Sequence, residues 1–237
     1  HTILTKILPR FGITHSYVDV ADGIDGWAAA ITSATRMIYV ETPTNPGLEI
    51  ADMDALGALA AARGVLLVVD NCMATPVLQQ PLRHGAHLSV HSATKFIDGQ
   101  GRVMGGVVVG RKDLINQIYT FCRSTGPALS PFNAWVLSKS LETLSLRMER
   151  HASNALAVAQ HLESSPDLEQ VRYPFLPSHP QYDVARRQMS SGGGLVAFTV
   201  KGGIDRGRRF LNALRLCSLT ANLGDTRTIA THPASTT

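Results

Sequence analysis

The chain has 237 residues, of which 44% are hydrophobic and 17% are charged, as is typical of a globular protein with a sizeable core. Its net charge of +4 is mild, and no basic run is interleaved with aromatic residues, so we expect no nucleic-acid partner. No apolar stretch approaches the roughly 20 residues of a membrane helix, so we expect no membrane association.

The three cysteines, Cys72, Cys122 and Cys217, are widely spaced and form no C-x-x-C pair. This pattern argues against a disulfide framework or a structural zinc site, and it is typical of a reducing compartment. We therefore expect a cytoplasmic protein. The chain opens at His1 and shows no signal peptide, and we interpret it as a fragment that lacks both ends of a longer chain.

Strand-like and helix-like patterns alternate in the first hundred residues. The expected helices cover residues 25–31, 53–63 and 78–83, and the expected strands cover residues 17–20, 37–41, 65–70 and 87–91. Asp52 is expected to cap the second helix, and Gly64 is expected to end it. Repeated β-α-β units of this kind predict an α/β fold with a mainly parallel sheet covered by helices.

The pattern changes in the second half of the chain. Ser130 and Pro131 are expected to start one long helical region that runs to about Leu162. Further strands are predicted at residues 169–173 and 195–200, followed by a helix at residues 205–214. We therefore expect part of a large domain, a connecting long helix and part of a smaller α+β C-terminal domain, with bounds at residues 1–130, 131–163 and 164–237.

Two of the predicted strands are followed by charged or hydroxyl side chains. One apolar run ends in Asp70, and another leads into Ser92, Thr94 and Lys95. The lysine can form a Schiff base with the aldehyde of pyridoxal phosphate (PLP), the hydroxyls can bind its phosphate, and the aspartate can keep its pyridine nitrogen protonated. Ligands of open α/β sheets bind beyond the carboxyl ends of the strands, where Glu41 also falls. The pattern favours a PLP site.

Each of these residues alone also has an ordinary structural interpretation. A lysine after a strand is usually solvated, Ser92 and Thr94 could form turns, and Asp70 could cap a helix. Their order along the chain, with a glycine-rich run at residues 99–106 after the lysine, favours the cofactor site over these alternatives.

Two other motifs do not favour a site. His84, His87 and His91 lie close together, but no carboxylate falls at ligand spacing, so we expect no metal site. The three glycines at residues 192–194 lack the lysine and the strand–helix context of a phosphate loop. We expect them to form a flexible lead into the next strand.

The chain resembles the Cys/Met-metabolism branch of fold-type I PLP-dependent enzymes over essentially its whole length. The resemblance rests on four stretches, Glu-Thr-Pro-Thr-Asn-Pro at 41–46, Val-Asp-Asn at 69–71, His-Ser-Ala-Thr-Lys at 91–95 and Gly-Gly at 105–106. It implies a PLP-dependent transferase-like fold, in which the first 130 residues are part of the PLP-binding domain.

Residues 96–102, 221–225 and 232–237 resemble the O-succinylhomoserine sulfhydrylases more than the lyases of this family. The resemblance implies a γ-replacement in methionine biosynthesis that converts O-succinyl-L-homoserine and sulfide to homocysteine and succinate. O-acetylhomoserine sulfhydrylase, cystathionine γ-synthase and γ-lyase activities stay open as alternatives, as does a non-catalytic scaffold remnant. Family members are usually homotetramers, so the resemblance also implies that the chain associates with copies of itself.

The resemblance also implies roles for individual residues. Lys95 would hold the cofactor and shuttle protons, and Asp70 would pair with the pyridinium nitrogen. Ser92 and Thr94 would bind the phosphate, and Asn45 would lie near the ring hydroxyl.

Asn222 would lie near the substrate. The family's N-terminal motifs, among them a tyrosine that stacks on the ring and a Tyr-x-Arg that reaches a neighbouring site, do not appear in this chain, and neither does the C-terminal arginine that holds the substrate carboxylate. We therefore expect the fragment alone to bind cofactor poorly and to be inactive.

Overall fold

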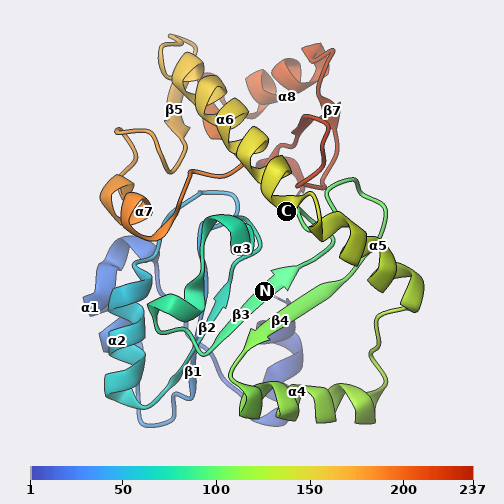
Figure 1. The fold of residues 1–237 in the computed structure, drawn as a ribbon. Helices are drawn as coiled ribbons and strands as arrows, with labels where there is room; N and C mark the ends of the chain where they lie inside the picture. The colour runs from blue at the N-terminus through green and yellow to red at the C-terminus, as the bar shows by residue number, and fades with distance from the viewer. Residues whose placement is uncertain (1, 237) are drawn as a thin grey trace.

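The computed structural model describes residues 2–236, and its centre is a four-stranded sheet with the order β1-β2-β3-β4 (Figure 1). The bounds of these strands are β1 Met37–Glu41, β2 Leu66–Asp70, β3 Leu88–Ser92 and β4 Gly106–Gly110. The first three strands pair in parallel, and β4 pairs antiparallel with β3 at the edge. The prediction of an α/β fold with a mainly parallel sheet is confirmed.

The register of the parallel strands decides which side chains share an edge. Glu41 lies opposite Asp70, and Asp70 lies opposite Val90. Strand β3 continues two residues further to Ser92. The carboxyl ends of β1, β2 and β3 therefore meet at one edge, as the sequence predicts.

Helices α1 (Gly23–Ala30) and α2 (Met53–Arg63) lie next to β1 and β2 (Figure 1). The Asp52 carboxylate accepts a hydrogen bond from the Ala55 N–H at 3.1 Å, and Gly64 ends α2 with a φ of +63°, so both predicted caps are confirmed. The apolar face of α2 packs against the buried face of the sheet in one cluster that includes Leu56, Ile38 and Leu67. Burial of this face holds the strand ends in place.

Two short segments differ from the prediction. Residues 17–20 form no strand, and a 3₁₀ turn, η3, covers Val20–Asp22, since the Asp19 side chain caps the backbone there. Instead of one helix at residues 78–83, the chain forms α3 (Thr75–Leu78) and a 3₁₀ turn, η4 (Pro81–His84). Pro81 lacks the backbone N–H that a continuous helix would need, which explains the break.

Several elements were not predicted. Strand β4 is a Gly-Val-Val-Val-Gly stretch that pairs only with β3, and helix α4 (Lys112–Thr125) follows it. Near the N-terminus the chain forms two short helical segments, η1 (Ile3–Ile7) and η2 (Leu8–Phe11).

The predicted long helix is instead two helices, α5 (Pro131–Leu141) and α6 (Leu144–Glu163). The Ser130 hydroxyl caps α5 by accepting from the Asn133 N–H at 3.1 Å, as predicted. Arg147, in the first turn of α6, reaches the loop after β3.

The C-terminal elements comprise two small sheets and three helices. Strands β5 and β6 pair antiparallel, and β7 and β8 pair in parallel. Their bounds, with those of the helices, are β5 Leu168–Arg172, α7 Tyr182–Gln188, β6 Ala197–Val200, α8 Gly203–Ala213, β7 Ser218–Leu219, β8 Ile229–Ala230 and α9 Pro233–Thr236. Figure 1 shows α6 running on from α5, with β5 on one side of it and α8 and β7 on the other. The division into domains near residue 163 stays a prediction. Among the described residues, the helices are all too short or too polar to cross a membrane.

Candidate active site

Asp70 ends β2, and both of its carboxylate oxygens accept hydrogen bonds. The backbone N–H of Cys72 donates to Oδ1 at 3.1 Å, which is the local turn that an aspartate commonly forms with the residue two positions on. The Tyr39 hydroxyl donates to Oδ2, also at 3.1 Å. Two donors from different segments therefore fix the orientation of this carboxylate.

Lys95 lies in the turn that follows β3. Its backbone N–H donates to the Ser92 carbonyl at 3.2 Å, and its Nζ donates to Oδ1 of Asn222 at 3.2 Å. These two side chains are 127 residues apart in the sequence. The structure therefore brings together the predicted cofactor lysine and the predicted substrate residue.

Cys72 contacts the ends of both β2 and β3. It is buried, and its thiol donates to the Ser92 carbonyl at 3.7 Å. Burial and the Asp70 carboxylate together raise the pKa of Cys72 to about 11, although the hydrogen bond to Ser92 and the charge of Lys95 oppose this shift. Cys72 therefore links the turn after Asp70 to the end of β3, three residues before Lys95.

Glu41 ends β1 directly opposite Asp70. Its carboxylate accepts a hydrogen bond from the Asn45 backbone N–H at 3.1 Å, which ties the exposed Asn45 loop to this edge of the sheet. Burial and, to a smaller extent, the Asp70 charge raise the pKa of Glu41 to about 6, although the Asn45 hydrogen bond opposes this shift. The edge therefore holds two neighbouring carboxyl groups, and the pKa of one of them, Glu41, is raised.

The two predicted phosphate-binding hydroxyls lie on either side of Ala93 in the same segment as Lys95. Ser92 is half-buried at the end of β3. The Thr94 hydroxyl accepts from the Gly105 N–H at 3.1 Å and donates to the Gly105 carbonyl at 3.3 Å. Thr94 thus fastens the lysine turn to the start of β4, and it would have to exchange these bonds to bind a phosphate.

Arg147 of α6 binds the backbone of the turn that carries Lys95. Its guanidinium donates to the carbonyls of Phe96, Ile97 and Ser140 at 2.6, 3.1 and 3.0 Å. Gly99 has a φ of +74°, and a Cβ there would collide with this guanidinium. The sequence gives no local signal for this contact, because Arg147 is about fifty residues from the carbonyls of Phe96 and Ile97.

The loop that carries Asn222 packs directly on the lysine turn. The Thr226 N–H donates to the Gly99 carbonyl at 2.9 Å, and a Cβ at Gly224 would collide with the backbone of Phe96. A hollow of about 240 Å³ lies beside this loop, lined in part by Asn222, Thr220, Asp225 and Arg227. The hydrogen bonds from Arg227 lower the pKa of the buried Asp225 to about 2, although burial opposes this shift.

This set of side chains fits PLP. It offers a primary amine at Lys95, a fixed carboxylate at Asp70 and hydroxyls at Ser92 and Thr94, all at the carboxyl ends of β2 and β3. Residues 2–236 contain no group of three or more His, Cys, Asp or Glu side chains that could hold a metal ion.

Tyr39 and Cys72 were not predicted as part of this site. Tyr39 could have been found, because it lies two residues before Glu41 in a predicted strand and therefore points to the same face. Cys72 could have been found as the residue two positions after Asp70, where an aspartate side chain commonly bonds the backbone.

Relatives of this chain are known. It is 51% identical over 235 residues to an O-succinylhomoserine sulfhydrylase of Pseudomonas aeruginosa and 47% identical over 230 residues to an L-methionine gamma-lyase of Pseudomonas putida. These matches cover 99% and 96% of the chain but 58% of each relative, so the chain spans less than two thirds of their length.

Two solved structures match this chain over 99% of its length. The crystal structure of metB from Corynebacterium glutamicum superposes with a TM-score of 0.96 at 37% identity, and the match covers 99% of this chain and 61% of that one. Cystathionine gamma-lyase from Lactobacillus plantarum, complexed with L-serine, gives a TM-score of 0.95 at 33% identity, with the same coverage. A family model described as Cys/Met metabolism PLP-dependent enzyme matches residues 1–237. The chain therefore belongs to the Cys/Met metabolism family of PLP-dependent enzymes.

Proposed function

We propose that the full-length protein catalyses a γ-replacement that converts O-succinyl-L-homoserine and sulfide to homocysteine and succinate. The bond from Cγ to the ester oxygen breaks, succinate leaves, and a bond from Cγ to sulfur forms. The observation that carries the proposal is the placement of Asp70 and of the Ser92–Lys95 segment at adjacent strand ends, which Cys72 joins through its hydrogen bonds to Asp70 and Ser92. The similarity to an O-succinylhomoserine sulfhydrylase supports the choice of substrate.

Bound PLP would supply an electron-poor ring that takes up the electron pair left at the substrate α-carbon when a proton is removed. Lys95 would hold the cofactor through Nζ and then accept and return protons with the same atom. Asp70 would keep the proton on the pyridine nitrogen. Ser92 and Thr94 would donate hydrogen bonds to the phosphate.

Asn45 would lie near the ring hydroxyl, and Asn222 would bind substrate. The hydrogen bond from Lys95 Nζ to Asn222 supports a second task for this amide, which is to orient the amine for proton transfer. The amide nitrogen of Asn222 keeps two donors that could face the substrate. The hollow beside Asn222 offers room for part of the substrate.

The test is a substrate comparison on the full-length protein. We expect homocysteine from O-succinylhomoserine and sulfide at a rate at least ten-fold above that from the acetyl ester. Methanethiol release from methionine would favour the second candidate, a γ-lyase, which the 47% identity to a methionine gamma-lyase supports. Cystathionine formation with cysteine would favour a γ-synthase. A colourless protein that does not bind PLP would contradict every one of these activities and favour a scaffold.

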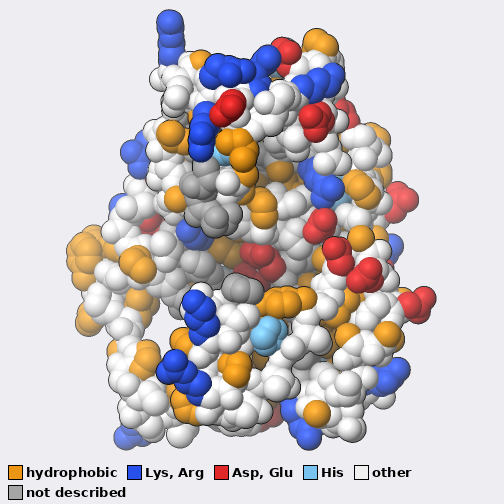
Figure 2. All heavy atoms as spheres, turned by 180° about the vertical axis from the view of Figure 1, so that it is seen from behind, with side chains coloured by type: hydrophobic (Ala, Val, Ile, Leu, Met, Phe, Trp, Pro, Cys, Tyr) orange, Lys and Arg blue, Asp and Glu red, His pale blue; other side chains and the backbone are white. Residues whose placement is uncertain are grey.

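We also propose that the protein is a homo-oligomer, a tetramer by resemblance, in the cytoplasm. Several hydrophobic side chains are exposed on the face seen in Figure 2, and large aromatic ones are exposed on α4 and α5, namely Phe121, Phe132 and Trp135. Such exposure supports association between copies. All three cysteines are free, which supports a reducing compartment. The native mass of the full-length protein tests the subunit count.

A further inference from the structure

Tyr39 and Asp70 lie diagonally across two neighbouring strands. In the parallel register of β1 and β2, Tyr39 is opposite Val68 and Glu41 is opposite Asp70, so Tyr39 and Asp70 share one face of the sheet, two positions apart. A diagonal pair is too far apart for short side chains but within reach of an aromatic one. The phenol spans this gap, and its hydroxyl donates to Asp70 Oδ2 at 3.1 Å.

We propose that Tyr39 is a positioning residue, which fixes the Asp70 carboxylate in the plane that lets it hold the proton of the pyridine nitrogen. This inference rests on the proposed function of Asp70. It adds to that function a residue that does not touch substrate and acts only through the carboxylate.

The need for a second anchor follows from the geometry of aspartate. The terminal torsion of an aspartate side chain is soft, so one hydrogen bond at Oδ1 leaves the carboxylate free to rotate about the Cβ–Cγ bond. The Cys72 N–H supplies that first bond, and Tyr39 supplies the second at Oδ2. A carboxylate oxygen has two lone pairs, so Oδ2 can accept from Tyr39 and from a ring N–H at the same time.

The phenol is suited to this task because it stays protonated. Burial raises the pKa of Tyr39 above its ordinary value, and the charge and the hydrogen bond of Asp70 raise it further. Tyr39 is 50% exposed, so a phenylalanine in its place would keep the ring packing and remove only the donor.

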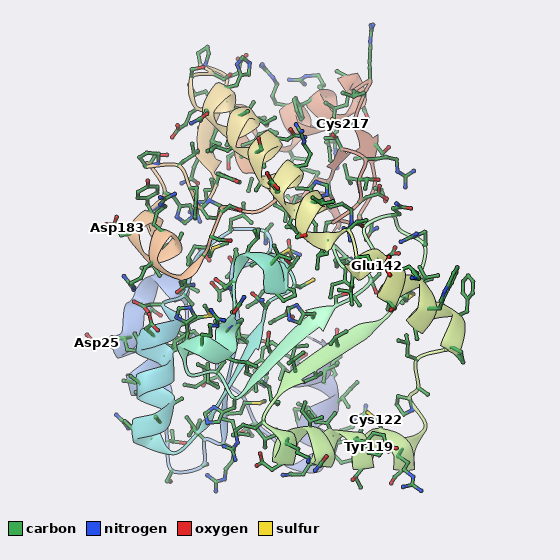
Figure 3. All side chains as sticks on the ribbon, viewed as in Figure 1. Asp25, Tyr119, Cys122, Glu142, Asp183 and Cys217 are labelled. Carbon is green, nitrogen blue, oxygen red and sulfur yellow. The ribbon has the colours of Figure 1, made fainter. Side chains whose placement is uncertain are left out.

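The experiment compares four variants of the full-length holoenzyme with wild type. They are Tyr39→Phe, Asp70→Asn, the double variant, and the control Tyr119→Phe. Figure 3 shows Tyr119 on α4. This helix follows the last residue of β4, which pairs with Leu88 at the start of β3. The candidate site lies at the other end of β3, so Tyr119 is remote from it. Three quantities are measured, namely the dissociation constant of PLP by spectroscopic titration, and kcat and KM for exchange of the substrate α-proton with solvent.

We expect Tyr39→Phe to weaken PLP binding about five-fold and to lower kcat for exchange by a similar factor, with KM within two-fold of wild type. In the Asp70→Asn background the same change should alter PLP binding and kcat by less than two-fold, because the anion that Tyr39 orients is gone. Tyr119→Phe should change none of them. Tyr39→Leu, which also lacks a donor, should repeat the result if the phenylalanine variant folds poorly.

Equal effects of Tyr39→Phe in both backgrounds would overturn the inference, since the residue would then act through general packing. No effect in either background would overturn it as well, while the proposed function would stand. Failure of the wild-type protein to bind PLP would instead overturn the proposed function, and this inference with it.

Discussion

The side chain of Asn222 accepts a hydrogen bond at 3.2 Å from Nζ of Lys95, although the two residues are 127 positions apart in the sequence. Hydrogen bonds to charged groups are stronger than neutral ones, and this one sets the direction of the amine. A substitution at Asn222 therefore tests whether this hydrogen bond orients the Lys95 amine.

We expect Asn222→Ala to lower the rate of α-proton exchange about ten-fold in the full-length protein, while PLP stays bound. Exchange into deuterated solvent, followed by NMR, measures this rate. Asn116→Ala on the exposed face of α4 is a matched control and should leave the rate unchanged. An unchanged rate in Asn222→Ala would show that the hydrogen bond to Lys95 has no role in proton transfer.

Lys95→Ala should abolish the visible absorbance of bound cofactor and nearly all turnover, because it removes the amine proposed to form the Schiff base. Spectroscopy of the full-length protein and an assay of homocysteine formation measure the two effects. Lys139→Ala is the matched control, since Lys139 forms an exposed ion pair with Glu142 on α5. Retention of both absorbance and turnover in Lys95→Ala would contradict the assignment.

Gly224→Ala tests the packing of the Asn222 loop on the lysine turn. Gly224 has a φ of +84°, and an added Cβ would collide with the Phe96 backbone. Gly203 has a φ of +65° with open space around it, so Gly203→Ala carries backbone strain without a collision. We expect Gly203→Ala to cost about 1 kcal/mol of unfolding free energy with normal activity. Gly224→Ala should cost more and reduce turnover, and equal effects in denaturation and activity measurements would refute the packing argument.

Glu41→Gln should change how stability depends on pH. The pKa of Glu41 is raised to about 6 in the folded protein from an ordinary value of 4.5, so the folded state binds more protons than the unfolded state in this window. The free energy of unfolding of the wild type therefore falls as pH rises from 4.5 to above 6. A glutamine at position 41 does not titrate, so the variant does not share this loss of stability.

We expect the advantage of Glu41→Gln over wild type to grow by on the order of 1 kcal/mol between pH 5 and pH 7.5, after allowance for screening by solvent. Chemical denaturation at both pH values measures it. Glu149→Gln, at an exposed position on α6, is the control for replacing a glutamate by glutamine. Parallel stability curves for Glu41→Gln and wild type would contradict the raised pKa.

The central part of the fold was predictable because its signals are local. Asp70 and Lys95 follow apolar runs, and parallel strands bring their carboxyl ends to one edge, which the register confirms. Strand β4 was missed because three valines between glycines are too short a signal, and its pairing with β3 comes from tertiary structure. The break between α5 and α6 was missed because residues 141–144 contain neither glycine nor proline.

The contacts that hold the lysine turn were not predictable from local sequence. Arg147 reads as a solvated residue on an amphipathic helix, and only the packing of α6 reveals that it reaches the Phe96 carbonyl. Asn222 was named through family resemblance alone. The alternation of side chains along a strand could have placed Tyr39 on the same face as Glu41. Its hydrogen bond to Asp70, however, depends on the register between β1 and β2, which the sequence alone does not reveal.

The hydrogen bonds of Arg147 join helices α5 and α6 to the turn that carries Lys95. The same guanidinium holds the carbonyl of Ser140 near the end of α5 and the carbonyls of Phe96 and Ile97 after the lysine. Any tilt or slide of α6 against the sheet is therefore transmitted to the backbone that carries the amine of Lys95. Substitutions at the α5–α6 junction would therefore move the Lys95 amine, although none of the substituted residues contacts substrate.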